Sequence, residues 1–470
     1  KYHRITQKVR ITTFLLQVSG SSKYLLRKLR KSSINRIYEH ILLKVDNNVF
    51  GTTLQVNDII ANGILKFGLD VEREIHRTRG VSLIEQRDNI VFSPTSLAAI
   101  LAIVLAGSAG RTFDEASKVL GLEAGIDISQ NSEIVHQMFG VLLSQLQSKE
   151  SAGILLPQLN FATNGFPILP QFKLLSKEIY QTDIFNVDFV RNGKGAEEMI
   201  NTWVRQKTKG KITSILNHVP GSGTAMILLS ALYFNGEWDQ YFLDGATKRP
   251  FFIEPNETVN VNMMYNGGTF PFYSDKKLGA KIIGFPYKGR ELSMYVLLPT
   301  TPGAKALREF KNKLTVDIIE NLIKNVKNET CIIGFPRMKL STSLSLRPTL
   351  AALGLESLFD PATADLSLIS QPNAVTNMGN RNQTNVSLRN SANLVNPHLF
   401  ATDVLQKVEM DITEKGTEAA AVTSVVLERD GSQKRFIANR PFVFFIRHDP
   451  SKLVLFWGTI NVPTPNYPTT

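Results

Sequence analysis

Residues 414–427 read Glu-Lys-Gly-Thr-Glu-Ala-Ala-Ala-Val-Thr-Ser-Val-Val-Leu, and this stretch is the most informative feature of the chain. Its alternate residues are small, hydroxylated or aliphatic: Thr417, Ala419, Ala421, Thr423, Val425 and Leu427. In a β-strand these residues would share one face, which could be buried beneath a sheet. The other face, with Glu418, Ala420, Val422, Ser424, Val426 and Glu428, tolerates solvent. The pattern alone leaves two interpretations open, an ordinary exposed loop or a segment that later joins a sheet.

The residues around this stretch are compatible with entry into a sheet. No proline occurs from Glu414 up to Arg440, so every residue between them has an amide donor for a central strand. Gly416 offers a hinge because its dihedral angles are little restricted. A charged and polar run, residues 428–434, then precedes the apolar stretch that begins at Pro441.

Residues 414–421 resemble the hinge of the reactive-centre loop of inhibitory serpins, a family of serine protease inhibitors. Further blocks resemble the same family and follow its order: 89–94 with Ser96, 201–212, 228–238, 440–444 and 455–459. The sequence is similar to a secreted, invertebrate-like, inhibitory member. The resemblance implies an α+β fold with three β-sheets, about nine helices and an exposed reactive-centre loop at 414–440.

The resemblance also implies a mechanism and a set of site residues. A target serine protease would cut the loop, become a covalent acyl-enzyme, and be trapped when the hinge enters the central sheet. The implied hinge residues are Glu414, Gly416, Thr417, Glu418, Ala419, Ala420 and Ala421. Non-inhibitory relatives tend to carry proline, bulky or charged residues there, and a binding or carrier module without inhibition is the alternative.

The bond that the protease cuts is predicted at one of two positions. Aligning the loop from both ends gives Asp430–Gly431, whereas relatives that cut one residue earlier give Arg429–Asp430. A trypsin-like pocket accepts Arg429 and rejects Asp430, while residues 427–431 resemble a caspase substrate. We favour Arg429 because a secreted chain seldom meets a caspase.

A third set of residues matches the family's sheet-opening region. The serines are Ser93 and Ser96, and Ser230 and Gln406 occupy positions where the family usually has an asparagine and a histidine. Glutamine can still bridge the strands through hydrogen bonds. Trp238 matches the family's buried tryptophan near the start of insertion.

The net charge of +12 is concentrated at the N-terminus. Residues 1–44 hold 11 Lys or Arg and one acidic residue, Glu39, whereas residues 45–470 hold 42 basic and 40 acidic residues. The main body, a serpin domain at 51–466, therefore has no electrostatic footprint for nucleic acid. We expect residues 1–50 to be a flexible basic extension, with polyanion binding through residues 1–44 as an alternative role.

Other features concern the environment of the chain. Four sequons, at Asn256, Asn328, Asn382 and Asn385, favour an extracellular, secreted glycoprotein. The asparagine-rich residues 369–396 are predicted to be a disordered surface insertion. The single cysteine, Cys331, is predicted to be a buried thiol in a strand at 331–335. No membrane span is expected, because no apolar run reaches 18 residues, and we expect a monomer.

A catalytic function is not supported by the motifs. The seven histidines show no metal-binding spacing, and neither a Gly-x-Ser-x-Gly elbow nor a phosphate-binding glycine loop occurs. We therefore expect an inhibitor without metal or cofactor, and not an enzyme.

Periodicity predicts the main elements. Helices are predicted at 56–75, 96–105, 113–120, 132–147 and 316–325. Strands are predicted at 160–163, 227–234, 281–285, 292–299, 337–346 and 408–412, with a hairpin at 441–460. Helices early and strands late favour an α+β fold.

Overall fold

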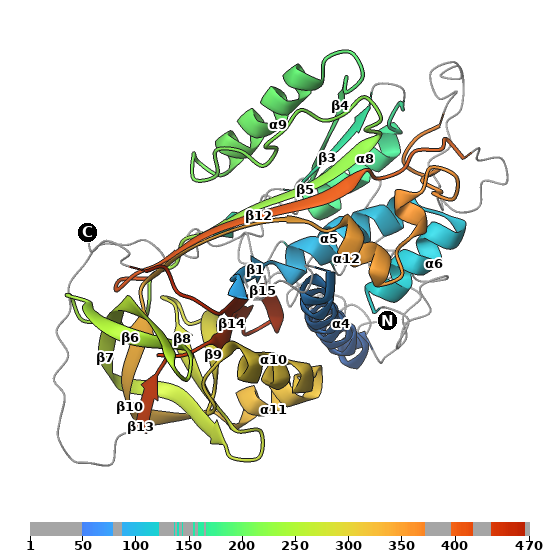
Figure 1. Ribbon diagram of the computed structural model, residues 1–470. Coiled ribbons are helices and arrows are strands. Elements are labelled where there is room, and N and C mark those ends of the chain that lie inside the picture. Colours follow the sequence, from blue (N-terminus) through green and yellow to red (C-terminus); the bar gives the residue numbers. More distant parts are fainter. Residues whose placement is uncertain are drawn as a thin grey trace.

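The computed structural model describes residues 49–78, 87–121, 136, 139–140, 143, 154–155, 158–163, 166–371, 396–416 and 434–465. Its strands form a six-stranded and a nine-stranded sheet, which lie side by side along the molecule (Figure 1). The helices of the described part are α4 (Val49–Thr78), α5 (Pro94–Gly107), α6 (Gly110–Val119), α8 (Pro170–Tyr180), α9 (Gly193–Lys207), α10 (Ala304–Lys313), α11 (Val316–Asn325) and α12 (Arg347–Ala352). The expected α+β class is confirmed.

The six-stranded sheet has the order β11–β12–β5–β3–β4, with β2 added beside β5. Its strands are β11 (Met338–Ser345), β12 (Asp403–Ile412), β5 (Met226–Phe234), β3 (Gln158–Thr163), β4 (Asp183–Val187) and β2 (Ile154–Leu155). In Figure 1, α9 covers one face of this sheet and α5 lies against the other. Both faces of β5 are therefore buried, which explains why its residues are apolar except for Ser230.

The two faces of β5 belong to different cores. Ile227, Leu229 and Ala231 pack with apolar residues of α9 such as Ile200 and Val204. The alternate residues of β5 join the large central core, together with the entirely buried α5. The two-residue period of a strand thus separates the side facing α9 from the side facing α5.

The nine-stranded sheet contains β1 (Ile90–Phe92), β15 (Leu453–Ile460), β14 (Phe442–His448), β9 (Leu292–Pro299), β8 (Ala280–Pro286), β7 (Glu257–Asp275), β10 (Lys327–Pro336), β13 (Lys434–Ile437) and β6 (Thr247–Glu254). Its long strand β7 pairs with β6 and β10, and with β8 through its last residues. The family resemblance implies three sheets, whereas the described strands form two hydrogen-bonded sheets. The number is smaller because β7 pairs with strands on both sides and so joins two parts of the nine-stranded sheet.

The predicted elements are present in the structure, apart from the helix at 132–147, most of which lies outside the described residues. The largest differences are at the start of α4, which begins at Val49 and not at 56, and of β12, which begins at Asp403 and not at 408. The predicted helix at 316–325 is α11 without change, and the predicted hairpin at 441–460 contains β14 and β15. The strand expected at Cys331 lies within β10. No helix in the described ranges is long and apolar enough to cross a membrane.

Candidate functional site

The centre of the six-stranded sheet is closed by a parallel ladder between β5 and β12. Eight register pairs connect them, from Ile227–Asp403 to Phe234–Met410. A segment that turned back from the end of β12 would run antiparallel to both of these strands. The direction of the strands therefore allows a new strand between β5 and β12, with antiparallel ladders on both of its sides.

Four buried polar residues lie at the middle of this ladder, and we call Ser93, Ser96, Ser230 and Gln406 the polar latch. Ser230 and Gln406 are register partners on β5 and β12. Ser93 caps α5, because its Oγ accepts a hydrogen bond from the Ser96 amide at 3.1 Å. The Oγ atoms of Ser96 and Ser230 form a hydrogen bond with each other. The structure thus brings these four sequence-predicted residues together.

The latch side chain of each strand is hydrogen-bonded to the start of α5 and not to the latch side chain of the other strand. The amide of Ser93 donates to Gln406 Oε1 at 2.7 Å, and Gln406 Nε2 donates to the Ser93 carbonyl at 3.3 Å. Ser230 contacts Ser96 instead. From the sequence we expected Gln406 to bridge the two strands directly. It does not, because the N-terminus of α5 lies between the side chains of Gln406 and Ser230.

The fifth predicted residue of the sheet-opening region, Trp238, lies beyond the end of the ladder. Its Nε1 donates to the Thr413 carbonyl at 3.0 Å, and its amide donates to the Lys415 carbonyl at 3.2 Å. Its ring stacks on Tyr287 with 4.5 Å between the ring centres. Trp238 is 1% exposed, so it anchors the chain that leaves β12 in an aromatic core.

Gly416 ends the described part of the predicted hinge and closes a tight turn. The amide of Thr413 donates to the Gly416 carbonyl at 2.8 Å, and the Gly416 amide donates back at 3.3 Å. A second bridge pairs Gly416 with Glu237, just after β5. Its φ of +140° lies in a region that favours glycine. A Cβ on it would lie 2.2 Å from the Gly236 carbonyl oxygen.

Glu414 is held by a charge that sequence reasoning missed. It is buried, and its Oε2 lies 3.6 Å from Nε of Arg337, a residue that is 3% exposed. Its carbonyl also accepts a hydrogen bond from the Phe242 amide at 2.8 Å. The signal in the sequence was Arg337, a single arginine between the apolar residues of β10 and β11. A buried arginine at such a position needs a partner of opposite charge.

An exposed ion pair lies beside Gly416, near the start of the predicted loop. Lys288 pairs with Glu237, and Tyr241 Oη donates to the same carboxylate at 2.9 Å. Hydrogen bonds from Lys288 and then Tyr241 lower the pKa of Glu237. The carboxylate therefore stays ionised beside Gly416 at neutral pH.

The remaining predicted loop residues lie outside the described residues. They are the hinge residues Thr417, Glu418, Ala419, Ala420 and Ala421 and the bond residues Arg429, Asp430 and Gly431. The sequons at Asn382 and Asn385, most of the 369–396 insertion and residues 1–48 lie outside them as well. The other sequon asparagines, Asn256 and Asn328, are described and exposed.

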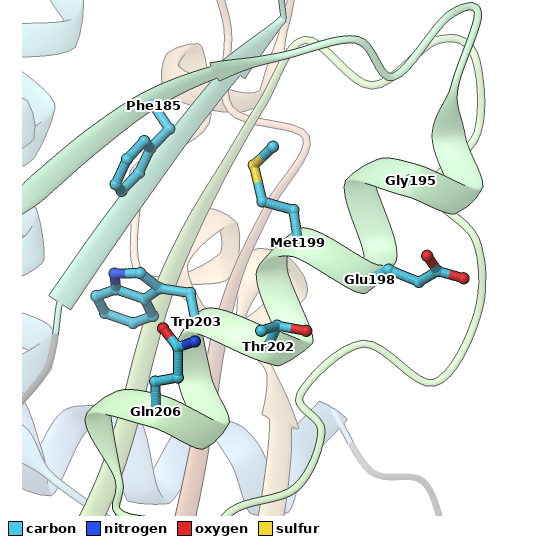
Figure 2. A pocket seen from close by; sticks show the side chains of 7 residues that line it. All are labelled: Phe185, Gly195, Glu198, Met199, Thr202, Trp203 and Gln206. Carbon is cyan, nitrogen blue, oxygen red and sulfur yellow. The ribbon is translucent and has the colours of Figure 1, made fainter.

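A shallow pocket of about 410 Å³ lies between α9 and β4 (Figure 2). Phe185, Met199 and Trp203 line it together with Gly195, Glu198, Thr202 and Gln206. Trp203 packs against the core beneath α9 and extends toward Phe185 of β4. Glu198 is the one carboxylate among the residues that line this pocket, so the pocket holds no cluster of titratable groups.

No group of metal-ligating side chains occurs in the described part of the chain. Cys331 is fully buried, and burial together with Glu329 raises the pKa of its thiol to about 12. The thiol is therefore protonated and unreactive at neutral pH.

Comparison with known proteins agrees with this geometry. The family model described as "Serpin (serine protease inhibitor)" matches residues 63–463. The chain belongs to the serpin family. It is a protease inhibitor of this family and not an enzyme.

Individual relatives match over most of this serpin's length. It is 32% identical to serine protease inhibitor 28Dc of Drosophila melanogaster, over 87% of this chain and 80% of that protein. It is also 32% identical to the leukocyte elastase inhibitor of Sus scrofa, over 85% and 98%. The crystal structure of mouse protein-Z dependent protease inhibitor superposes with a TM-score of 0.73 and 25% identity, over 88% of this chain and 99% of that one.

Proposed function

We propose that this serpin inhibits an extracellular trypsin-like protease as a suicide substrate, and that its cut loop inserts between β5 and β12. The observation that carries the proposal is the pair of bridges made by Gly416. One bridge pairs Gly416 with Thr413 at the end of β12, and the other pairs it with Glu237 after β5. Both are antiparallel, so Gly416 already occupies the first position of a strand between the two.

Extending both bridges along the chain predicts a single register. Antiparallel pairing from Gly416 would bring Ala419 between Met410 and Phe234, which are register partners in the closed sheet. The same counting would bring Thr423 between Gln406 and Ser230, which are also partners. The two bridges therefore agree, and no slip of register is needed for insertion.

This register also matches the sequence pattern of the loop. Residues directly opposite in a ladder point to the same face. The partners on β12 would be Ile412, Met410, Val408, Gln406 and Val404, all of which are buried. Opposite them would stand Thr417, Ala419, Ala421, Thr423 and Val425, the small or aliphatic face. Burial of this face, and two ladders of hydrogen bonds in place of the one between β5 and β12, would drive insertion.

The polar latch would open during this step. A strand between β5 and β12 roughly doubles their separation, from about 4.8 Å to about 9.6 Å. Ser230 and Gln406 would lose their register contact, and the hydroxyl of Thr423 would enter between them. A hydroxyl both donates and accepts hydrogen bonds, so the Thr423 hydroxyl would pair with the side chains of Ser230 and Gln406 that insertion separates.

The catalytic groups that break the peptide bond would be those of the protease. Its serine oxygen would attack the carbonyl carbon of Arg429, and the peptide bond to Asp430 would break as the amine of Asp430 leaves with a proton. The resulting ester would persist because insertion distorts the protease before water attacks. Arg429 supports a trypsin-like target; cleavage after Asp430 by a caspase is the alternative.

Extracellular action is supported by the sequons. Asn256 and Asn328 are exposed, as glycosylation requires. The basic residues 1–44 favour attachment to polyanions outside the cell. Binding to heparin that is lost with rising salt and on removal of residues 1–44 would test this role.

The direct test incubates the protein with trypsin and with a panel of caspases, followed by a denaturing gel and mass spectrometry. We expect an adduct with trypsin that survives denaturation, and a released peptide that begins at Asp430. A peptide that begins at Gly431 would assign the bond to Asp430. Cleavage without an adduct would reject inhibition and leave a binding module.

A further inference from the structure

Three cationic side chains lie near one another around β13, the first described strand after the predicted loop. Lys281 belongs to β8, Arg435 to β13, and Arg440 follows β13. Lys281 Nζ donates to the Arg435 carbonyl at 3.0 Å. Arg440 Nε donates to the carbonyl of Pro299 at 2.6 Å, and Pro299 is the ladder partner of Ala280, next to Lys281. Backbone contacts thus fix the three charges near one another.

These charges are not neutralised within the described residues. None of the three lies within 4.0 Å of a carboxylate there, although the fold forms many surface ion pairs elsewhere, such as Arg290 with Asp239. Burial, then the charges of Arg440 and Arg435, lower the pKa of Lys281. The nearby Asp275 accepts hydrogen bonds from the amides of its own turn instead. A like-charged cluster of this kind attracts anionic groups.

The position of the cluster identifies what would meet it. Arg435 lies only six positions after Arg429 in the chain, a span of at most about 20 Å. A protease bound to the loop is wider than this span, so its surface beside the active-site cleft would lie over β13 and β8. The cluster is also compact, whereas a polyanion needs a row of cations along its length.

We propose that Lys281, Arg435 and Arg440 form a docking surface for an acidic patch beside the active site of the protease that this loop captures. This inference rests on the proposed inhibitory function and adds the charge of the preferred target. Complementary charge mainly raises the rate of association and makes that rate depend on salt.

The test compares two trypsins that share a specificity pocket and differ in surface charge, the anionic and the cationic form. Their rates of adduct formation are measured with the full chain and with Lys281→Gln/Arg435→Gln. The control, Lys173→Gln/Lys177→Gln, removes the same charge from exposed positions of α8, at the opposite end of the molecule from β13 (Figure 1). Thermal unfolding of each variant verifies that the fold is intact.

We expect the double substitution at the cluster to slow association with anionic trypsin by about 5-fold to 10-fold at low salt. Cationic trypsin and the α8 control should show less than a 2-fold change. Equal slowing with both trypsins, or no slowing, would overturn the docking surface while adducts still form. Loss of heparin retention without a change in rate would assign the cluster to a polyanion instead. Absence of any adduct would reject the inhibitory function itself.

Discussion

Gly416 is required at its position for two separate physical reasons. Its φ of +140° disfavours residues with a side chain, and a Cβ would collide with the Gly236 carbonyl. Gly416→Ala should therefore lower the free energy of unfolding by about 2–4 kcal/mol, since strained backbone alone accounts for about 1–3 kcal/mol. Gly354→Ala is the control, because Gly354 has φ +104° but a Cβ on it would meet nothing within 4 Å. Equal losses in urea unfolding would show that the contact with Gly236 contributes nothing.

Gln406 satisfies two buried main-chain groups of Ser93. Gln406→Met keeps the length of the side chain and removes both hydrogen bonds. We expect a loss of about 1–3 kcal/mol in the free energy of unfolding, because the buried Ser93 amide is left unpaired, whereas the Ser93 carbonyl still accepts the Leu97 amide at 3.1 Å. The same substitution at Gln206, an exposed residue of α9, should change stability by less than about 0.5 kcal/mol. If both variants unfolded alike, the latch would have no role in keeping the sheet closed.

Glu72 of α4 belongs to a buried network with Lys311, His76, Thr459 and Trp457. Lys311 Nζ lies 3.0 Å from its carboxylate, and Trp457 Nε1 donates to it at 2.8 Å. Burial raises the pKa of Glu72, but Lys311, His76 and Thr459 outweigh it and lower the pKa from 4.5 to about 2. Burial also lowers the pKa of Lys311, against the effect of Glu72.

The network makes stability depend on pH in a defined window. The folded pKa of Glu72 lies below its unfolded value, so its contribution is present above pH 4.5 and is lost as the pH falls toward 2. The shift corresponds to about 3 kcal/mol. In Glu72→Gln, urea unfolding should show that much less change between pH 5 and pH 2 than the wild type. Glu356→Gln, at an exposed carboxylate, should keep the wild-type slope; an unchanged slope in Glu72→Gln would contradict the assignment.

At the scale of elements, the inserting face of the loop can be tested by a buried charge. Ala419→Glu would bring a carboxylate between Met410 and Phe234, at a cost of several kcal/mol. The variant should be cut as a substrate, so the number of inhibitor molecules used per protease should rise at least about 5-fold. Ser432→Glu lies after both candidate bonds and should leave that number near the wild-type value. Equal values for the two variants would exclude the predicted register.

The elements that sequence periodicity predicted are those with one clear apolar pattern. β9 and α11 are of this kind. β6 and β7 were missed, because β7 combines glycine, proline and asparagine and changes its buried parity along its length. α8 and α10 were missed as well, since one of the three buried residues in each is polar, Ser176 in α8 and Lys311 in α10, which interrupts the apolar stripe.

The candidate site was only partly predictable for a related reason. The latch residues were found from the family resemblance, because their spacing along the chain carries no signal. The close approach of Gly416 to Gly236 joins residues about 180 positions apart, and no local pattern encodes it. The pair of Glu414 and Arg337 is likewise a product of tertiary packing.

For the whole molecule, the central claim is that the closed sheet is not the most stable arrangement of this chain. Eight parallel pairs hold β5 against β12, while the loop between β12 and β13 carries a face suited to the gap between them. We propose that cleavage removes a covalent connection that prevents insertion of this loop. The native fold would then be kinetically stable, because the uncut chain prevents the loop from inserting between β5 and β12.

The most direct measurement is calorimetry before and after a single cut at Arg429 or Asp430. Insertion replaces the ladder between β5 and β12 by two ladders and buries a new apolar face, so the unfolding temperature of the cut protein should rise by at least about 10 °C. Cut Ala419→Glu should show no such rise. A wild-type protein whose unfolding temperature stayed the same or fell after the cut would contradict the central claim.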